Sequence, residues 1–279
     1  MGKIYSPDPF PYVPSVTSGC DLSHIAAAIR ETRMSRQKPH YGLDAPGIVR
    51  GFLVGGPLLA LAGFLLRRYA RPHEIHPLIA LANTALCTGL VLFLESFLML
   101  ASSYYGKSRA RDKLLAGLKL RGDETVLDVG CGHGLLLIGA AKQLPRGRAL
   151  GIDLWSQVDQ GDNSRDATLQ NARIEGVEDR IEVHDGDMRK LPFPDASVDA
   201  VVANLAIHNI SSREGRREAI REIARVLRPG GQVALMDFKK VAEYAEDLRA
   251  DGLPDARVSP PVFWIFPPVR IATGTKPRQ

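Results

Sequence analysis

The sequence predicts an α/β protein in which a mostly parallel sheet, covered by helices on both faces, is preceded by two apolar helices. Two long apolar runs lie within the first 106 residues. From Asp112 onward, short apolar segments alternate with helical ones, which is the order of parallel strands joined by crossover helices. The last two apolar segments have no helix between them, so we expect them to pair as a hairpin that makes the final strand antiparallel.

The N-terminal region begins with an irregular arm. Residues 1–20 are rich in Pro, Ser and aromatic residues, and a short helix is expected to follow from Asp21 or Ser23. The apolar runs come only after residue 50. They are therefore too far along the chain to be a secretory signal.

The two runs differ in length. Gly51–Leu66 holds 16 uncharged residues, which as a helix span about 24 Å, less than a hydrocarbon core of about 30 Å. Pro77–Leu94 holds 18 uncharged residues, and Glu95 is the only charge before Gly106. Two arrangements stay open: a helical hairpin that crosses the bilayer twice, or helices that lie at its interface or pack against the soluble domain.

Charge favours the hairpin, with both ends of the chain on the cytoplasmic side. The net charge is +5, and the basic residues gather at the ends of the runs: Arg33, Arg36, Lys38 and Arg50 before the first, Lys107, Arg109, Arg111 and Lys113 after the second, against Arg67, Arg68 and Arg71 in the turn. This placement suits membrane lipids and an inside-positive topology rather than nucleic acid. Arg50 and Glu95 could then meet at one membrane face; alternatively, either side chain could snorkel to the interface.

These features divide the chain into an arm (residues 1–50), a membrane-associated hairpin (51–106) and an α/β domain (107–279). Residues 1–106 are expected to be dispensable for ligand binding by that domain. The three cysteines, Cys20, Cys87 and Cys131, are far apart and indicate neither a disulfide framework nor a redox motif. No metal-binding cluster is expected.

From Asp112 onward, the sequence predicts strands and helices in a regular order. Strands are expected at 125–130, 148–153, 180–187, 198–205 and 232–238, helices at 135–144, 167–176, 213–227 and 241–252, and the final hairpin from 256–266 and 269–277. In such a sheet a ligand binds at the carboxyl ends of the strands. The polar residues that follow these strands are therefore the candidate site.

The strongest motif is Asp128-Val-Gly130-Cys-Gly132-His-Gly134, between the first strand and its helix. Glycines there allow positive φ and a close approach of backbone to ligand. A dinucleotide fingerprint would need its third glycine at position 135, which is Leu135, and a P-loop would end in Gly-Lys-Ser/Thr. Both pyrophosphate-binding interpretations are disfavoured.

Asp153 ends the next strand, 19 residues after Gly134. A carboxylate at this place can accept hydrogen bonds from both ribose hydroxyls of an adenosine; the alternative is a solvated acid at a strand end. Leu154 and Trp155 would lie against the adenine, unless Trp155 belongs to a lid. The polar segment 155–172 is longer than usual and is interpreted as a cover of the site.

The D-x-G-x-G-x-G loop, Asp153, and the segments 191–204 (LPFPDASVDAVVAN) and 221–238 (REIARVLRPGGQVALMDF) resemble class I S-adenosylmethionine-dependent methyltransferases. The resemblance extends over about residues 112–279 and is to the small-molecule branch, which includes enzymes of ubiquinone and menaquinone biosynthesis. It implies a Rossmann-like doubly wound fold and S-adenosylmethionine as cofactor. It also implies that Asp187 accepts from the adenine amino group and that Met188 offers a backbone donor.

The acceptor side is expected after the fourth strand, at Asn204–Ile210. His208 is the candidate general base because its proton affinity suits neutral pH; alternatively it only shapes the acceptor pocket. Asn204 is expected to orient the cofactor.

The predicted function is methyl transfer to a small, lipid-soluble acceptor at a membrane. Two alternatives stay open: a non-catalytic, regulatory cofactor-binding module on a membrane, and a nicotinamide oxidoreductase. The motifs select neither the methylated atom nor the oligomeric state.

Overall fold

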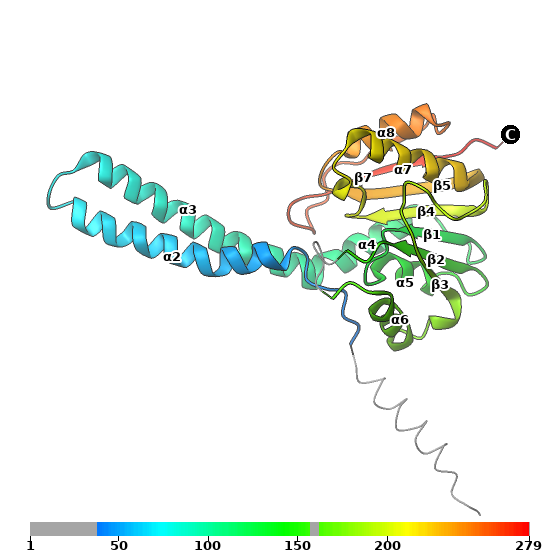
Figure 1. The fold of residues 1–279 in the computed structure, drawn as a ribbon, viewed down its shortest axis with the longest axis horizontal. Helices are drawn as coiled ribbons and strands as arrows, with labels where there is room; N and C mark the ends of the chain where they lie inside the picture. Colours follow the sequence, from blue (N-terminus) through cyan, green and yellow to red (C-terminus); the bar gives the residue numbers. More distant parts are fainter. Residues whose placement is uncertain (1–37, 157–161, 279) are drawn as a thin grey trace, which may run out of the picture. The chain divides into compact units, whose positions relative to one another are not determined.

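The computed structural model describes residues 38–156 and 162–278 (Figure 1). The predicted arm and the short helix after it lie outside the described residues, as do residues 157–161 of the polar segment that follows Asp153.

Two long antiparallel helices form the apolar region (Figure 1). They are α2 (Pro46–Ala70) and α3 (His76–Ala101), and α3 continues through the π-helix η1 (Ser102–Gly106) into α4 (Lys107–Gly117). Helix α2 begins five residues before the uncharged run Gly51–Leu66 and ends four residues after it. Both helices are long and apolar enough to cross a membrane.

Small residues hold the two helices together. A Cβ added at Gly56 would lie 2.8 Å from the Gly89 carbonyl oxygen, and one at Gly63 would lie 2.5 Å from the Leu86 nitrogen. Backbones that approach this closely are typical of helix pairs in membranes, where small residues form the contact.

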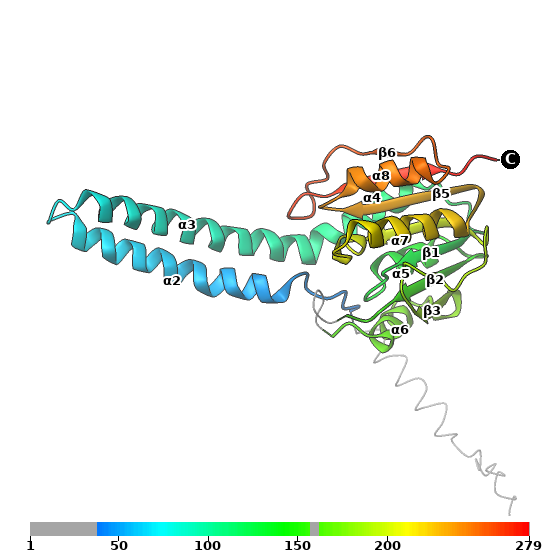
Figure 2. The ribbon, with the colours of Figure 1, turned by 45° about the horizontal axis from the view of Figure 1, so that its top comes forward.

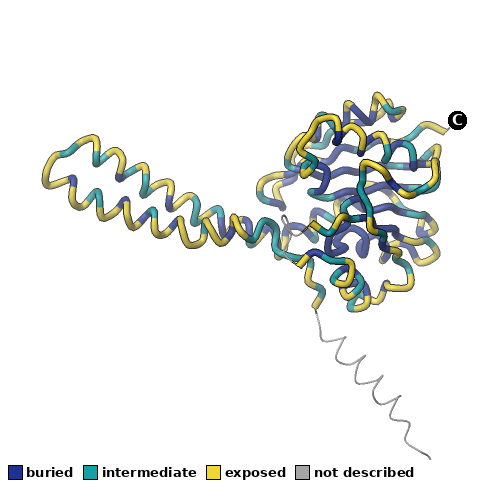
Figure 3. The backbone as a smooth tube through the Cα atoms, viewed as in Figure 1, coloured by how far each residue is buried: buried dark blue, intermediate teal, exposed yellow. Residues whose placement is uncertain are grey.

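Large apolar side chains of the hairpin point outward instead. Leu58, Phe64 and Leu94 are 61%, 52% and 59% exposed, and the tube in Figure 3 alternates between buried and exposed residues along both helices. A soluble protein would bury such side chains. The arrangement in which the helices pack against the catalytic domain is therefore disfavoured. The expected Arg50–Glu95 ion pair is not found among the ion pairs of the described residues, and Arg50 is exposed.

The catalytic region contains one seven-stranded sheet with the order β3-β2-β1-β4-β5-β7-β6. The strands are β1 (Thr125–Val129), β2 (Arg148–Asp153), β3 (Ile181–Asp185), β4 (Val198–Asn204), β5 (Leu227–Asp237), β6 (Arg257–Val258) and β7 (Arg270–Thr275). Strands β1 to β5 are parallel, and β7 is antiparallel to both β5 and β6. This confirms the predicted mostly parallel sheet with an antiparallel last strand.

Helices cover both faces of the sheet (Figures 1 and 2). Helix α4 and α5 (Leu135–Lys142) pack on one face with α6 (Arg165–Ile174), and α7 (Arg213–Val226) and α8 (Val241–Ala250) on the other. The helices α6 and α7 begin at serine caps: Ser164 accepts from the Ala167 amide at 3.2 Å and Ser212 from the Gly215 amide at 3.0 Å.

The chain reverses its direction across the sheet between β1 and β4. Such a switch point, at the carboxyl ends of the strands, is where ligands bind in open α/β sheets. The predicted site residues after β1 and β4 therefore meet at this place.

Candidate active site

The glycine loop turns sharply between β1 and α5. Gly130, Gly132 and Gly134 have φ angles of +75°, +49° and +84°, a region that side chains disfavour. A Cβ at Gly130 would lie 2.4 Å from the Cβ of Ala206, in the loop after β4. The loops of the two strands are thus in direct contact, and Gly130 is required for that contact.

Asp128 is buried behind this loop, with 2% of its surface exposed. Its Oδ2 accepts the Leu137 amide at 2.8 Å, near the start of α5, whereas Oδ1 has no hydrogen-bond partner among the described residues. Burial raises the pKa of Asp128 to about 8, with a smaller contribution from the negative charge of Asp153, against the opposing effect of the Leu137 hydrogen bond. Asp128 therefore stabilises the start of α5 through Oδ2, and its Oδ1 has no hydrogen bond in the described part of the chain.

Asp153 connects the end of β2 to the glycine loop. Its Oδ2 accepts the Gly132 amide at 2.8 Å, and its Oδ1 accepts the Trp155 amide at 2.6 Å and the Asn163 side chain at 3.3 Å. An ionised carboxylate has about four acceptor positions, so it retains little capacity beyond these contacts. Asp153 positions the loop in addition to its predicted role toward a ribose.

The two residues after Asp153 differ in their surroundings. Leu154 is 64% exposed. Trp155 has a φ of +59°, and its indole Nε1 donates to Asp185 Oδ1 at 2.7 Å. Its ring therefore contacts the end of β3, and its predicted roles, against an adenine or in a lid, stay predictions.

Asp187 is paired with a neighbour that the sequence analysis did not consider. Its carboxylate accepts from the Arg189 amide at 2.8 Å and from the Arg189 guanidinium at 2.5 to 3.1 Å. The hydrogen bond from Arg189 lowers the pKa of Asp187, against a smaller opposing effect of burial. The side chain of Met188 lies beside Gly130, 3.4 Å from where a Cβ would be. The roles of Asp187 and Met188 toward an adenine stay predictions.

A small pocket lies against the loop. It is lined by Tyr41, Asp44, Lys107, Asp128, Gly130, Cys131, Gly132, His133, Leu135, Leu136 and Asn204. Four predicted residues meet here: Asp128, Gly130, Gly132 and Asn204. The others, Gly134, Asp153, Leu154, Asp187 and Met188, do not line it. The Oδ1 of Asn204 is buried without a partner in the described part of the chain, as is that of Asp128.

Two lining residues come from outside the predicted domain 107–279. They are Tyr41 and Asp44, which belong to residues 39–45, here called the strap. A third lining residue, Lys107, begins α4. Lys107 is buried and donates to the carbonyls of Tyr41 at 2.8 Å and Gly42 at 2.5 Å, with Asp44 at 3.6 Å. Because the strap lines the pocket, the expectation that residues 1–106 are dispensable for ligand binding does not fit this structure.

The other end of the strap is tied to α6. The His40 amide donates to the Asn171 side chain at 2.9 Å, and Asn171 Nδ2 donates to the carbonyls of His40 at 2.9 Å and His133 at 3.0 Å. The Tyr41 hydroxyl donates to Glu175 at 3.0 Å. Asn171 therefore joins the strap directly to the glycine loop.

His208 lies on the other side of the Ala206 contact, in the short helix η3 (Ile207–Asn209). Its Nδ1 is 2.9 Å from Asp237 Oδ1, and its amide donates to Asp237 Oδ2 at 3.2 Å. Asp237 is 1% exposed at the end of β5 and also accepts from the Tyr244 hydroxyl at 3.1 Å. A histidine oriented by a buried carboxylate is the arrangement of a general base.

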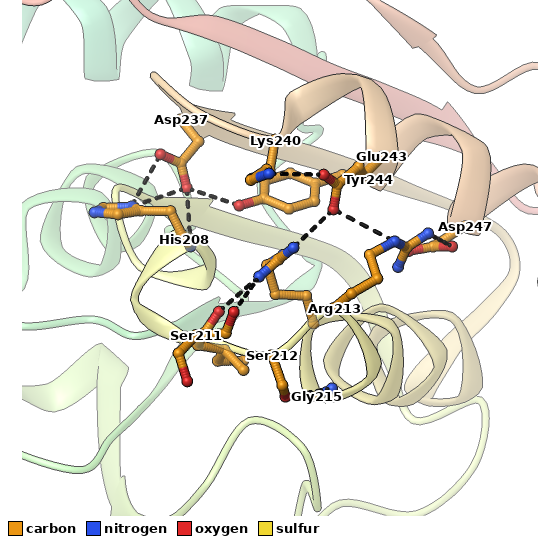
Figure 4. Close-up of polar contacts among 12 residues, drawn as sticks. His208, Ser211, Ser212, Arg213, Gly215, Asp237, Lys240, Glu243, Tyr244 and Asp247 are labelled. Carbon is orange, nitrogen blue, oxygen red and sulfur yellow. Dashed lines mark hydrogen bonds and ion pairs between the residues drawn. The ribbon is translucent and has the colours of Figure 1, made fainter.

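The surroundings hold this pair rigidly. In Figure 4, His208 and Tyr244 approach Asp237 from opposite sides. Below them, Arg213 makes two hydrogen bonds of 2.7 Å to Asp247, which join α7 to α8. Tyr244 is fully buried, and burial together with Asp237 raises its pKa, so it stays a hydrogen-bond donor.

Within the described ranges, no three His, Cys, Asp or Glu side chains are grouped so as to hold a metal ion. Cys131 is buried in the glycine loop, and burial raises the pKa of its thiol well above the usual value. It is therefore a packing residue rather than a reactive one.

Comparison with known sequences identifies the region between β1 and β5. Residues 127–235 match the family described as "Methyltransferase domain". The chain is 36% identical over 147 residues to 27-O-demethylrifamycin SV methyltransferase of Amycolatopsis mediterranei, which covers 52% of this chain and 49% of that protein. It is 31% identical over 130 residues to demethylmenaquinone methyltransferase of Lactobacillus johnsonii, covering 46% and 49%. The chain spans about half the length of these curated relatives.

Solved structures share the fold. The [4+2]-cyclase SpnF has a TM-score of 0.51 at 22% identity, covering 62% of this chain and 82% of that one. A putative O-methyltransferase from Nostoc punctiforme has a TM-score of 0.50 at 18% identity, covering 65% and 60%. Both likenesses concern the fold alone, which hosts a cyclase as well as a transferase.

Proposed function

Because the chain carries a class I S-adenosylmethionine-dependent methyltransferase domain, we propose that it methylates a small, lipid-soluble acceptor at a membrane. The methyltransferase class and its cofactor follow from the family. The acceptor and the membrane location are the proposal, with the catalytic domain on the cytoplasmic side.

The observation that carries the cofactor assignment is the pair of unpartnered oxygens in the pocket. Asp128 Oδ1 and Asn204 Oδ1 are buried, lack hydrogen bonds in the described part of the chain, and line the same space beside the glycine loop. Buried acceptors of this kind are costly unless a ligand satisfies them. S-adenosylmethionine has an ammonium group that can donate to the Asn204 oxygen. Binding of this cation would also favour the ionised form of Asp128, whose pKa burial raises to about 8.

The residues of the chain would then act by holding the cofactor and orienting the acceptor. The bound cofactor would supply an already activated methyl group, so positioning of the acceptor provides most of the rate. In the tautomer that donates from Nδ1 to Asp237, His208 would have Nε2 available to accept a proton from an acceptor hydroxyl or amine. Asp237 fixes that tautomer, and Tyr244 in turn fixes Asp237.

The membrane location is supported by the hairpin. Glycine and alanine make much of its helix contact, whereas large side chains such as Leu58, Phe64 and Leu94 are exposed. Lipid tails cover such a surface at no cost, and water does not. An enzyme anchored in this way would find its acceptor dissolved in the bilayer.

Ligand binding by the full chain in detergent separates this proposal from its alternatives. S-adenosylhomocysteine should raise the Tm, and NAD should not, because Leu135 replaces the third glycine of a dinucleotide loop. The matched control is Gly130→Val, whose Cβ would overlap Ala206 and which should lose the shift. A shift with NAD alone would identify an oxidoreductase instead. Binding without turnover on any acceptor would indicate the regulatory module.

A further inference from the structure

Four exposed aromatic side chains surround the junction between the hairpin and the catalytic domain. Tyr104 and Tyr105 of η1 are 69% and 72% exposed, and Phe263 and Trp264 of the loop between β6 and β7 are 76% and 46% exposed. We call these four residues the aromatic girdle. Such exposure is unusual for rings of this size in a soluble domain.

All four lie at one level along the helix axis. The Trp264 carbonyl oxygen packs so closely on Gly106 that a Cβ there would lie 1.7 Å from it. The Phe266 amide donates to Ser102 Oγ at 3.0 Å, so the loop crosses η1 from its first residue to its last. Figures 1 and 2 both show this loop beside the end of α3. The girdle therefore combines residues that are about 160 positions apart in the sequence.

The distance from the turn to the girdle matches a bilayer. From His76 to Tyr104 the helix rises by about 40 Å at about 1.5 Å per residue, and a bilayer with its headgroups is about 40–45 Å thick. The uncharged run that ends at Leu94 would instead place the boundary at Glu95, about 15 Å short of the girdle. Phe97 and Leu98 lie between these two levels and are 50% and 43% exposed.

Charged residues are few on the hairpin before the girdle, and exposed basic residues follow directly after it. Arg50 and Glu95 are the charged residues of the hairpin between its turn and Tyr104, and both side chains are long enough to reach toward an interface. Directly after η1, Arg109 and Lys113 are exposed, and the Lys113 ammonium lies 5.5 Å from the centre of the Trp264 ring. Aromatic rings next to basic side chains are typical of the headgroup region.

We propose that the aromatic girdle, rather than Glu95, marks the membrane–water interface, and that Phe263 and Trp264 seat the catalytic domain on the headgroups of the bilayer. This rests on the proposed membrane location. The occupant of the surface is the lipid bilayer, because the girdle continues the lipid-facing surface of α3 and is followed by exposed positive charge.

The assignment explains how an apolar acceptor would reach the site. Lys107 follows Gly106 directly, and it lines the pocket together with Tyr41 of the strap. With the girdle in the headgroups, this side of the pocket faces the bilayer surface. A lipid-soluble acceptor would enter from the membrane without crossing bulk water.

The two tryptophans of the chain, Trp155 and Trp264, allow a direct test. The Trp155→Phe variant reports on Trp264, and the matched Trp264→Phe variant reports on Trp155. Each full chain is reconstituted into phosphatidylcholine–phosphatidylglycerol vesicles whose acyl chains carry bromine either near the headgroup or near the methyl end. A third reporter, Leu94→Trp with both native tryptophans replaced by Phe, marks a level deeper on α3.

Trp264 should lose more emission with shallow bromines than with deep ones, as expected for an interfacial ring. Leu94→Trp should respond more to deep bromines, and Trp155 to neither. Quenching of Trp264 by aqueous iodide alone, with Leu94→Trp responding to shallow bromines, would place the boundary at Glu95 and overturn the proposal. A chain that does not float with the vesicles would overturn the membrane location as well, so the two failures can be told apart.

Discussion

Replacing Asp128 with asparagine should remove a specific pH dependence from the stability of the protein. Burial raises the pKa of this carboxyl from 3.8 to about 8. A carboxyl whose pKa is raised by folding binds more protons in the folded state, so its contribution to stability falls as the pH rises. The loss begins near the unfolded pKa and is complete above about pH 8.

The size of the effect follows from the pKa. Within this window the wild type should lose at most about 1.4 kcal/mol per pH unit, or about 2 kcal/mol between pH 6 and pH 8. For a domain of this size that corresponds to about 4–8 °C in Tm. An asparagine cannot ionise, and its carbonyl can still accept the Leu137 amide.

The measurement is thermal unfolding of the full chain in detergent at several pH values, for wild type, Asp128→Asn and Asp123→Asn. Asp123 is exposed and serves as the matched control. The difference between wild type and Asp128→Asn should grow with pH, whereas Asp123→Asn should follow the wild type. Parallel curves for wild type and Asp128→Asn would show that Asp128 ionises freely, and the description of the pocket would be wrong.

Four further substitutions, one of them with a matched control, test other parts of the site and the hairpin. Asp153→Ala should weaken S-adenosylmethionine binding by about 1.5–3 kcal/mol for each charge-assisted hydrogen bond lost, and unchanged affinity by calorimetry in a folded variant would reject the ribose role. His208→Gln and Asp237→Asn should each reduce turnover by about 10²-fold or more with little change in cofactor affinity; normal turnover at saturating acceptor would make His208 a pocket residue only. Gly56→Ile should destabilise the hairpin by about 1–3 kcal/mol in detergent unfolding, whereas Gly55→Ile should not, because nothing lies within 4 Å of a Cβ at that position. Equal effects of the two glycine variants would contradict the helix contact.

The sequence was sufficient to predict features that depend on local order. The strands and helices after Asp112 alternate, so the parallel sheet follows from topology rules, and the absence of a helix before β7 predicts its antiparallel direction. The glycine loop could be recognised because positive φ at Gly130 and Gly134 is a local requirement.

Contacts between distant segments could not be predicted in this way. Lys107 was interpreted as one of several basic residues flanking the apolar runs, yet it is buried and holds the strap over the pocket. Asp237 and Tyr244 orient His208 from β5 and α8, about 30 positions away. Arg189 belongs to no recognisable motif, although its guanidinium donates to the carboxylate of Asp187. A single sequence without these contacts offers no signal for any of them.

The most direct measurement of the proposed function follows the methyl group itself. The full chain is reconstituted in vesicles with S-adenosylmethionine labelled in its methyl group, and an organic-solvent lipid extract or an aqueous metabolite extract is added as the source of acceptor. We expect label to pass into a solvent-extractable product only with the lipid extract, and Gly130→Val to transfer none. Label found only in water-soluble products would contradict the lipid-soluble acceptor, and absence of any transfer by a chain that binds the cofactor would contradict the enzyme.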